Sequence, residues 1–168
     1  MSNNRVIWLT EEDPPDAFPP VANALREPDG LLAAGGDLSV ERLLAAYRQG
    51  IFPWFSEGQP LLWWSPDPRC VFRKGDFHLS RRLRRELQKS TAEVRFNTAF
   101  ADVVVACAAP RRYEESTWIT GDMITAYNAV HRSGWAQSVE IWQEGRLVGG
   151  LYGSSIGRVL FGESRFSG

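Results

Sequence analysis

Apolar and polar positions change their period along the chain, and these changes predict its elements. Repeated Pro and Gly interrupt residues 10–36, so we expect no regular element there. A helix then follows, with Asp37 or Ser39 as its N-cap and Gly50 as its end. Apolar side chains spaced one turn apart form its inner face: Leu43, Leu44 and Tyr47. The N-terminal part is therefore predicted to be a small, loop-rich unit around one helix.

A proline-rich boundary separates this part from the rest of the chain. The Pro66-Asp67-Pro68 sequence predicts a small N-terminal domain of residues 1–68 and a second domain of residues 69–168. Beyond the boundary we expect a short strand at residues 69–73 and a helix that Ser80 caps. In this helix leucines repeat at every fourth position, and basic residues cover the other faces: Arg81, Arg82, Arg84, Arg85 and Lys89.

The last part of the chain combines helical and strand-like periods. Two helices are predicted at residues 98–108 and 121–132. The predicted strands are residues 93–96, 137–143, 146–152 and 158–166, with Glu144-Gly145 as a tight hairpin turn. Two helices followed by an antiparallel meander predict an α+β fold. The last strand runs to the chain end and leaves an edge uncovered, so we expect an incomplete domain.

The net charge of −1 conceals an uneven distribution. Residues 1–68 hold four Arg against ten Asp or Glu, whereas residues 69–95 hold nine Lys or Arg against three acids. Most of this positive charge lies on the helix that Ser80 is predicted to cap. Two interpretations stay open: a patch for an anionic partner, or a solvated helix face.

Tryptophan is abundant, with seven copies in 168 residues, and several lie beside Pro or Gly: Trp54, Trp63, Trp64 and Trp118. Flat side chains in loops either fill the core or form platforms on which bases stack. Cys70 and Cys107 are expected to be reduced thiols, and no histidine has a ligand-like spacing to them, so no metal site is expected. No apolar run is long enough to cross a membrane and no secretory signal is visible, so we expect a cytoplasmic protein.

Familiar catalytic motifs are missing from the sequence. It has no phosphate-binding loop, nucleophile elbow, HExxH or CxxC motif, and it lacks the pyrophosphate loop of CoA-dependent acetyltransferases. Glu163 lies between apolar neighbours, and at period 2 it shares a face with Phe161 and Arg165. It is either a binding carboxylate or an Arg-paired or solvated acid. Glycines in the predicted strand pair, at Gly149, Gly150 and Gly153, indicate either a ligand that approaches closely or a bulge.

Seven short blocks then carry a family resemblance. They are GLLAAGGDL at 30–38, YRQGIFPWF at 47–55, WWSPDPR at 63–69, TWIT at 117–120, SVEIW at 138–142, LVGGLYG at 147–153 and GES at 162–164. In this order they resemble the leucyl/phenylalanyl-tRNA–protein transferases. The resemblance runs from residue 18 to residue 167. It implies a catalytic domain like that of the acetyltransferases (the GNAT fold) behind a small N-terminal domain.

The resemblance implies an enzyme that moves Leu or Phe, and also Met, from aminoacyl-tRNA to proteins that begin with Arg or Lys. Such proteins are thereby marked for degradation under the N-end rule. Neither a metal nor another cofactor is implied, because the aminoacyl ester is already activated and alignment supplies much of the rate. The partners implied are the charged tRNA and the acceptor protein, and we expect a monomer.

Specific residues acquire roles from the same resemblance. Trp54 and Trp118 would hold the 3′-terminal adenosine of the tRNA. The amino-acid side chain would enter an apolar pocket near Leu151 and Phe161, with Tyr127 nearby. Glu163 would be the catalytic carboxyl, orienting the reacting groups or the cationic N-terminus of the acceptor. Phosphates of the acceptor stem would contact the basic helix, through Arg81, Arg82, Arg84, Arg85 and Lys89.

The chain also departs from the family. After GES the family usually continues with Met-Phe-Ser-Arg, whereas Arg165-Phe166-Ser167-Gly168 stand here. Family members extend further and hold other reaction-centre residues in that extension. We therefore expect a C-terminally truncated member, with the alternative that it is an inactive fragment that retains only tRNA or RNA binding.

Overall fold

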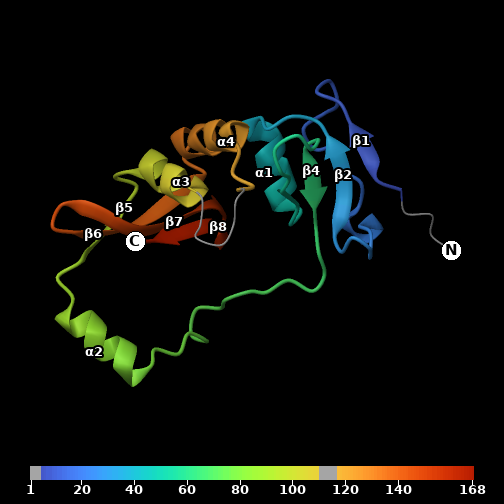
Figure 1. Ribbon diagram of the computed structural model, residues 1–168. Coiled ribbons are helices and arrows are strands. Elements are labelled where there is room, and N and C mark those ends of the chain that lie inside the picture. Colours follow the sequence, from blue (N-terminus) through green and yellow to red (C-terminus); the bar gives the residue numbers. More distant parts are fainter. Residues whose placement is uncertain (1–4, 110–116) are drawn as a thin grey trace.

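The computed structural model describes residues 5–109 and 117–168, whose strands form two four-stranded sheets (Figure 1). The N-terminal sheet has the order β1-β2-β4-β3, formed by Ile7–Leu9, Leu31–Gly35, Leu62–Trp64 and Phe52–Pro53. The C-terminal sheet has the order β5-β6-β7-β8, formed by Glu93–Phe96, Ala136–Gln143, Arg146–Ile156 and Val159–Ser167. The helices are α1 (Val40–Arg48), α2 (Arg81–Lys89), α3 (Phe100–Ala108) and α4 (Gly121–Arg132), with a short 3-10 turn at Val21–Asn23. The expected α+β class is confirmed.

The expectation that residues 10–36 hold no regular element was wrong, because β2 lies inside this range. It pairs in parallel with β1 and antiparallel with β4. Its central residues Leu32, Ala33 and Ala34 are buried, so the run between two glycine clusters is a core strand. Packing against two neighbouring strands overrides the weak local propensity of Gly and Ala.

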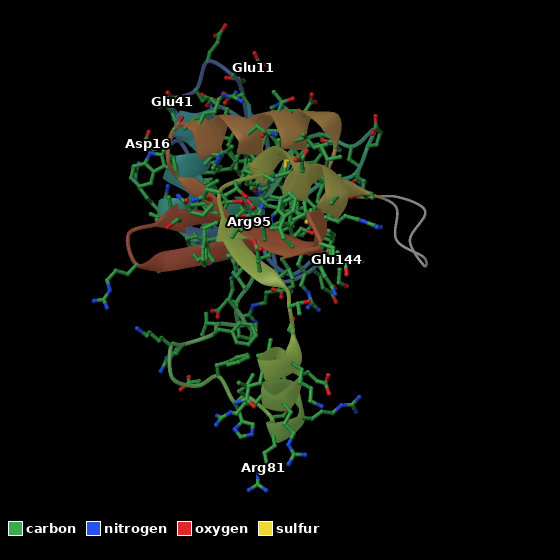
Figure 2. All side chains as sticks on the ribbon, turned by 90° about the vertical axis from the view of Figure 1, so that its left-hand side faces the viewer. Glu11, Asp16, Glu41, Arg81, Arg95 and Glu144 are labelled. Atoms are coloured by element: carbon green, nitrogen blue, oxygen red, sulfur yellow. The ribbon has the colours of Figure 1, made fainter. Side chains whose placement is uncertain are left out.

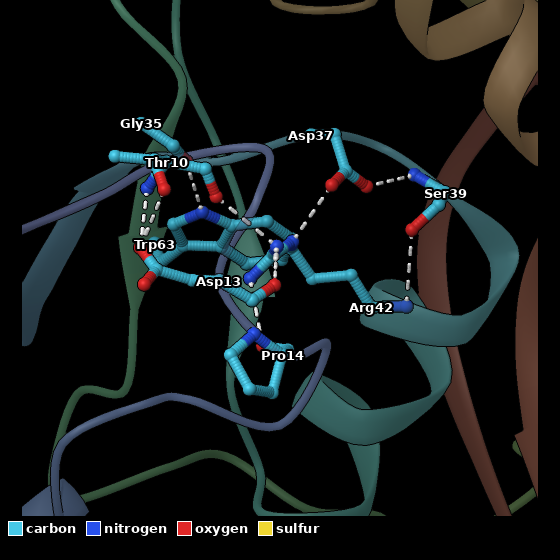
Figure 3. A network of polar contacts seen from close by, with 8 residues as sticks. All are labelled: Thr10, Asp13, Pro14, Gly35, Asp37, Ser39, Arg42 and Trp63. Atoms are coloured by element: carbon cyan, nitrogen blue, oxygen red, sulfur yellow. Dashed lines mark hydrogen bonds and ion pairs between the residues drawn. The ribbon is translucent and has the colours of Figure 1, made fainter.

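Helix α1 begins and ends where predicted, and it holds the loop that follows β1 in place. The Ser39 hydroxyl accepts a hydrogen bond from the backbone N–H of Arg42, and Gly50 with φ +76° follows the last turn. Arg42 is 1% exposed, and its guanidinium donates to Asp37 and to three backbone carbonyls, those of Thr10, Asp13 and Pro14 (Figure 3). The buried arginine therefore ties the loop after β1 to α1.

Helix α2 also forms where expected, but it stands apart from both sheets (Figures 1 and 2). The Ser80 hydroxyl accepts a hydrogen bond from the backbone N–H of Leu83. None of its residues is buried, so the leucine stripe covers no core here. The strand expected at residues 69–73 was wrong: these residues run as an extended link toward α2, without the neighbouring strand that a ladder requires.

The C-terminal sheet carries α3 and α4 on one face (Figure 1). Both helices form where predicted and bury apolar side chains, among them Val103 and Val104 of α3 and Met123 and Val130 of α4. The hairpin turn at Glu144-Gly145 is confirmed by positive φ at both residues. The start of α3 has no cap from its own N-cap residue. Instead the buried carboxylate of Glu140, on β6, accepts the backbone N–H groups of Thr98 and Ala99. Side chains on the other face are more exposed, as at Val94 (56%) and Phe96 (64%).

Helix α1 connects the two parts of the molecule. It contacts β7 and α4 of the C-terminal part while it packs beside β3 of its own. Buried apolar residues form one cluster that includes Leu32 and Trp63 from the N-terminal part and Tyr127 and Tyr152 from the C-terminal part. Tyr47 of α1 also meets β8, where its ring lies against Phe161 and its hydroxyl donates to Glu163.

Candidate functional site

A pocket of about 220 Å³ lies where α1, the end of β3, the link at Arg69 and strand β8 meet. Residues far apart in the sequence line it: Tyr47, Phe52, Pro53, Trp54, Arg69, Trp118, Phe161, Gly162 and Glu163. The lining is mostly aromatic, with one carboxyl group and one guanidinium. Such a pocket suits a flat ligand that also carries polar or charged groups.

The structure brings Trp54 and Trp118 together in this pocket. Trp54 is 50% exposed, and its backbone carbonyl accepts a hydrogen bond from the indole of Trp64 at 2.6 Å. Trp118 is partly buried in the loop that leads into α4. Trp63, by contrast, is fully buried and donates to the Gly35 carbonyl. Trp63 on β4 therefore fills the core, whereas Trp54 and Trp118 line the pocket.

Glu163 reaches the pocket because β8 has a bulge. The register pairs Tyr152 with Ser164 but Gly153 with Gly162, so Glu163 is the additional residue. Its carboxyl accepts a hydrogen bond from the hydroxyl of Tyr47, which is also hydrogen bonded to the hydroxyl of Tyr127. We had expected Glu163 and Arg165 to share one face of β8 because they are two residues apart. This expectation was wrong, because the additional residue of the bulge interrupts the regular alternation of side chains between the two faces of the strand.

Gly153, one of the three glycines expected to mark either a close ligand or a bulge, lies opposite this bulge. A Cβ at Gly153 would lie 2.2 Å from the carbonyl oxygen of Phe161 on β8. Backbone, rather than a flexible side chain, fills that space. Gly153 therefore permits the close approach of β7 and β8 that aims Glu163 at the pocket.

Burial dominates the electrostatics of this cluster. It raises the pKa of Glu163 to about 7, although hydrogen bonds from Tyr47 and Tyr127 and the charge of Arg69 act in the opposite direction. Burial, together with the charge of Glu163, holds the pKa of Tyr47 and of Tyr127 well above the ordinary value. Both tyrosines therefore keep their protons near neutral pH and can donate hydrogen bonds to the carboxyl group.

Other expected site residues lie outside the pocket lining. Tyr127 is fully buried behind Tyr47 and reaches the pocket through that hydroxyl. Leu151 is half-buried on β7, where the register pairs it with Val139 and Arg165. The basic side chains of α2 are all exposed and stand apart from the two sheets (Figure 2).

The sequence assigned no site role to five residues of the pocket lining: Tyr47, Phe52, Pro53, Arg69 and Gly162. Tyr47 was assigned to the apolar face of α1, and its hydroxyl was given no role. Phe52 and Arg69 were not singled out, although each lies in one of the seven motif blocks. Arg69 donates to the Gly50 carbonyl at 3.2 Å, and its guanidinium lies 4.5 Å from the centre of the Phe52 ring. Both contacts join residues far apart in the sequence, so the spacing of apolar and polar residues could not predict them.

Within residues 5–109 and 117–168, no three His, Cys, Asp or Glu residues are grouped as metal ligands would be. Cys70 is exposed and Cys107 is buried, and neither forms a disulfide. No helix in the described part of the chain has the length and apolar character needed to span a membrane.

Comparison with known proteins gives consistent matches. Residues 36–67 match the model of the leucyl/phenylalanyl-tRNA protein transferase N-terminal domain, and residues 71–168 match the model of the leucyl/phenylalanyl-tRNA protein transferase. The leucyl/phenylalanyl-tRNA–protein transferase of Stutzerimonas stutzeri is 58% identical over 96% of this chain and 71% of its own length. Those of Pseudomonas syringae and Xanthomonas campestris are 61% and 59% identical over 89% and 95% of this chain.

Fold, pocket and matches define the class as an α+β protein from a family of aminoacyltransferases. The chain belongs to the leucyl/phenylalanyl-tRNA–protein transferase family, as the resemblance of the seven blocks implied. It spans 66% and 65% of the length of the Pseudomonas syringae and Xanthomonas campestris relatives.

Proposed function

We propose that this protein transfers Leu or Phe, and also Met, from aminoacyl-tRNA to the N-terminal Arg or Lys of acceptor proteins. The acceptors would thereby be marked for degradation under the N-end rule. The proposal depends on one observation: Trp54, Trp118 and Glu163 line the same pocket. The GNAT-like character of residues 69–168 and the cytoplasmic, monomeric state remain predictions.

The pocket supports this function through the chemistry of its walls. A base that stacks on Trp54 and Trp118 gains about 1–3 kcal/mol per base without any reading of tRNA sequence. Phe161 supplies apolar surface beside the carboxyl group of Glu163. The acceptor offers an α-amine whose ordinary pKa of roughly 7.7–8.0 leaves about a tenth to a fifth of it uncharged and nucleophilic at pH 7.

Glu163 would orient the reaction rather than act as a nucleophile. A carboxyl group with a pKa of about 7 exists in both protonation states near neutral pH. It can therefore accept a hydrogen bond from the incoming amine or hold the cationic N-terminus of the acceptor. Tyr47 and Tyr127 keep it in one orientation from α1 and α4. The amine nitrogen attacks the carbonyl carbon of the ester, the bond to the ribose oxygen breaks, and the amine proton passes to that oxygen, which leaves as the ribose hydroxyl.

A transfer assay tests the proposal on the 168-residue chain itself. Phe-tRNA and a peptide that begins with Arg are incubated with the wild type and with Trp54→Ala, Trp118→Ala and Trp8→Ala. Loss of a stacking platform should lower kcat/KM about 5- to 150-fold for the two pocket variants. Trp8 is 64% exposed and outside the pocket lining, so its variant is the matched control. Equal kcat/KM in all four proteins would refute the assignment of the pocket.

Helix α2 is proposed to hold the acceptor stem through its exposed arginines. Phosphate contacts of this kind make binding weaken steeply with salt. Exchange of Arg81, Arg82, Arg84 and Arg85 for Glu should lower tRNA affinity in a filter-binding titration and flatten its dependence on salt. An unchanged salt slope would contradict a role for α2 in phosphate binding.

The second candidate function is tRNA binding without transfer. The observation that favours it is the exposed basic surface of α2, which requires no reaction centre. Under this alternative, Trp54→Ala weakens binding to tRNA with an intact CCA end, and the transfer assay yields no product with any variant. Product formation by the wild type would exclude the alternative.

A further inference from the structure

Arg69 is the one cationic side chain among the mostly aromatic residues that line the pocket in the described part of the chain. Its guanidinium lies over the ring of Phe52 and donates through Nη1 to the Gly50 carbonyl. Both contacts come from the N-terminal part, so they fix the side chain beside Trp54. Arg69 is exposed, and most of its five N–H donors remain available to a ligand.

Arg69 forms no ion pair with any residue that the structure describes. Glu163, the pocket's carboxyl group, experiences the charge of Arg69 without a direct contact between the two. A guanidinium that a ring and a carbonyl hold in place, with most of its N–H donors exposed, is arranged to receive an anion from outside.

A nucleotide chain supplies an anion at the right place. A base in the pocket of Trp54 and Trp118 has its sugar and phosphate at the edge of the stack, and Arg69 lines the same pocket. We propose that Arg69 binds the phosphate that joins the terminal adenosine to the nucleotide before it. This inference rests on the proposed function, since it names the part of the tRNA end that the cation recognises. Arg69 would thus select a nucleic-acid end over a free nucleoside.

Binding of two short probes to the full 168-residue chain tests the inference. The first probe is the dinucleotide CpA, and the second is the same dinucleotide with a neutral methylphosphonate in place of the phosphate. Calorimetric titration of the wild type should give about tenfold tighter binding of CpA, because a charge-assisted bond to phosphate is lost in the second probe. In Arg69→Gln the two probes should bind equally, with the affinity that the wild type has for the methylphosphonate.

Two control variants separate this inference from the proposed function. Arg73→Gln removes an exposed charge from the same link outside the pocket, and it should keep the tenfold preference. Trp54→Ala should weaken both probes alike, because it removes the platform and leaves the cation. Retention of the preference in Arg69→Gln would overturn the inference and leave the stacking site intact. Failure of the wild type to bind either probe would overturn both.

Discussion

Replacement of Glu140 by Gln should destabilise the protein strongly at neutral pH, although the two side chains have nearly the same shape. Glu140 is fully buried, and one carboxylate oxygen accepts the backbone N–H groups of Thr98 and Ala99 at 2.9 and 2.8 Å and the Ser138 hydroxyl at 2.8 Å. The other oxygen accepts the Thr98 hydroxyl and the indole N–H of Trp142. A carboxamide NH₂ in place of either oxygen cannot accept these bonds.

The pKa of Glu140 gives the magnitude. Burial raises this pKa, but the hydrogen bonds from Thr98, Ala99, Ser138 and Trp142 outweigh burial and lower it from 4.5 to about 2. A difference of this size corresponds to about 3 kcal/mol of unfolding free energy in favour of the ionised form. For a chain of this length, such a loss lowers Tm by roughly 6–12 °C.

The sign of the pH dependence follows from the depressed pKa. The stabilisation is fully present above pH 4.5, the unperturbed value, and is lost as pH falls through about 2. Urea unfolding followed by circular dichroism should therefore show a large gap between the wild type and Glu140→Gln at pH 7 and a smaller gap at pH 3. Glu57→Gln, an exposed acid in a turn, serves as the control and should change little. A gap below about 0.5 kcal/mol at pH 7, typical of surface substitutions, would refute the reasoning.

Three further predictions concern the same fold and pocket. Arg42→Lys should lower the unfolding free energy by about 2–4 kcal/mol in urea titration, because an ammonium group cannot reproduce the fork that reaches Asp37 and the three loop carbonyls. Gly153→Ala should cost about 1–3 kcal/mol by the same measurement, because its Cβ would lie 2.2 Å from the Phe161 carbonyl oxygen. Glu163→Gln should raise Tm relative to the wild type at pH 8 and leave it unchanged near pH 4. Since the folded-state pKa is raised to about 7, the wild type loses stability as pH rises through that value, whereas the carboxamide does not titrate.

Each of these predictions has a matched control and an outcome that contradicts it. Arg48→Lys changes an exposed arginine of the same helix, and a loss equal to that of Arg42→Lys would mean that the buried fork adds nothing. Gly162→Ala adds a Cβ that meets no atom within 4 Å, so equal losses at both glycines would remove the argument from close strand approach. A Tm of Glu163→Gln below that of the wild type at pH 8 would show that the ionised carboxylate is not disfavoured by its surroundings.

The sequence by itself determined most of the local structure and the family. Helices α1 and α4 have local caps at Ser39 and Thr120, and α1, α3 and α4 have apolar faces at helical spacing. The hairpin between β6 and β7 has a turn with positive φ at both residues. These signals are local, since each depends on residues a few positions apart. The seven motif blocks likewise lie in single short stretches, so the family was recognisable without a structure.

Tertiary structure decided what depends on distant partners. β2 became a core strand because β1 and β4 lie on its two sides. Residues 69–73 form no strand, and none of the strands in residues 5–109 and 117–168 pairs with them. The bulge that separates Glu163 from Arg165 exists only in the pairing of β7 with β8. The pocket joins Tyr47, Arg69 and Glu163 from segments that no sequence period relates. The periodicity of a sequence indicates which face of its own helix or strand a side chain occupies. A site also requires that the faces of different elements lie at set positions relative to one another. Those positions come from the packing of the elements in the tertiary structure.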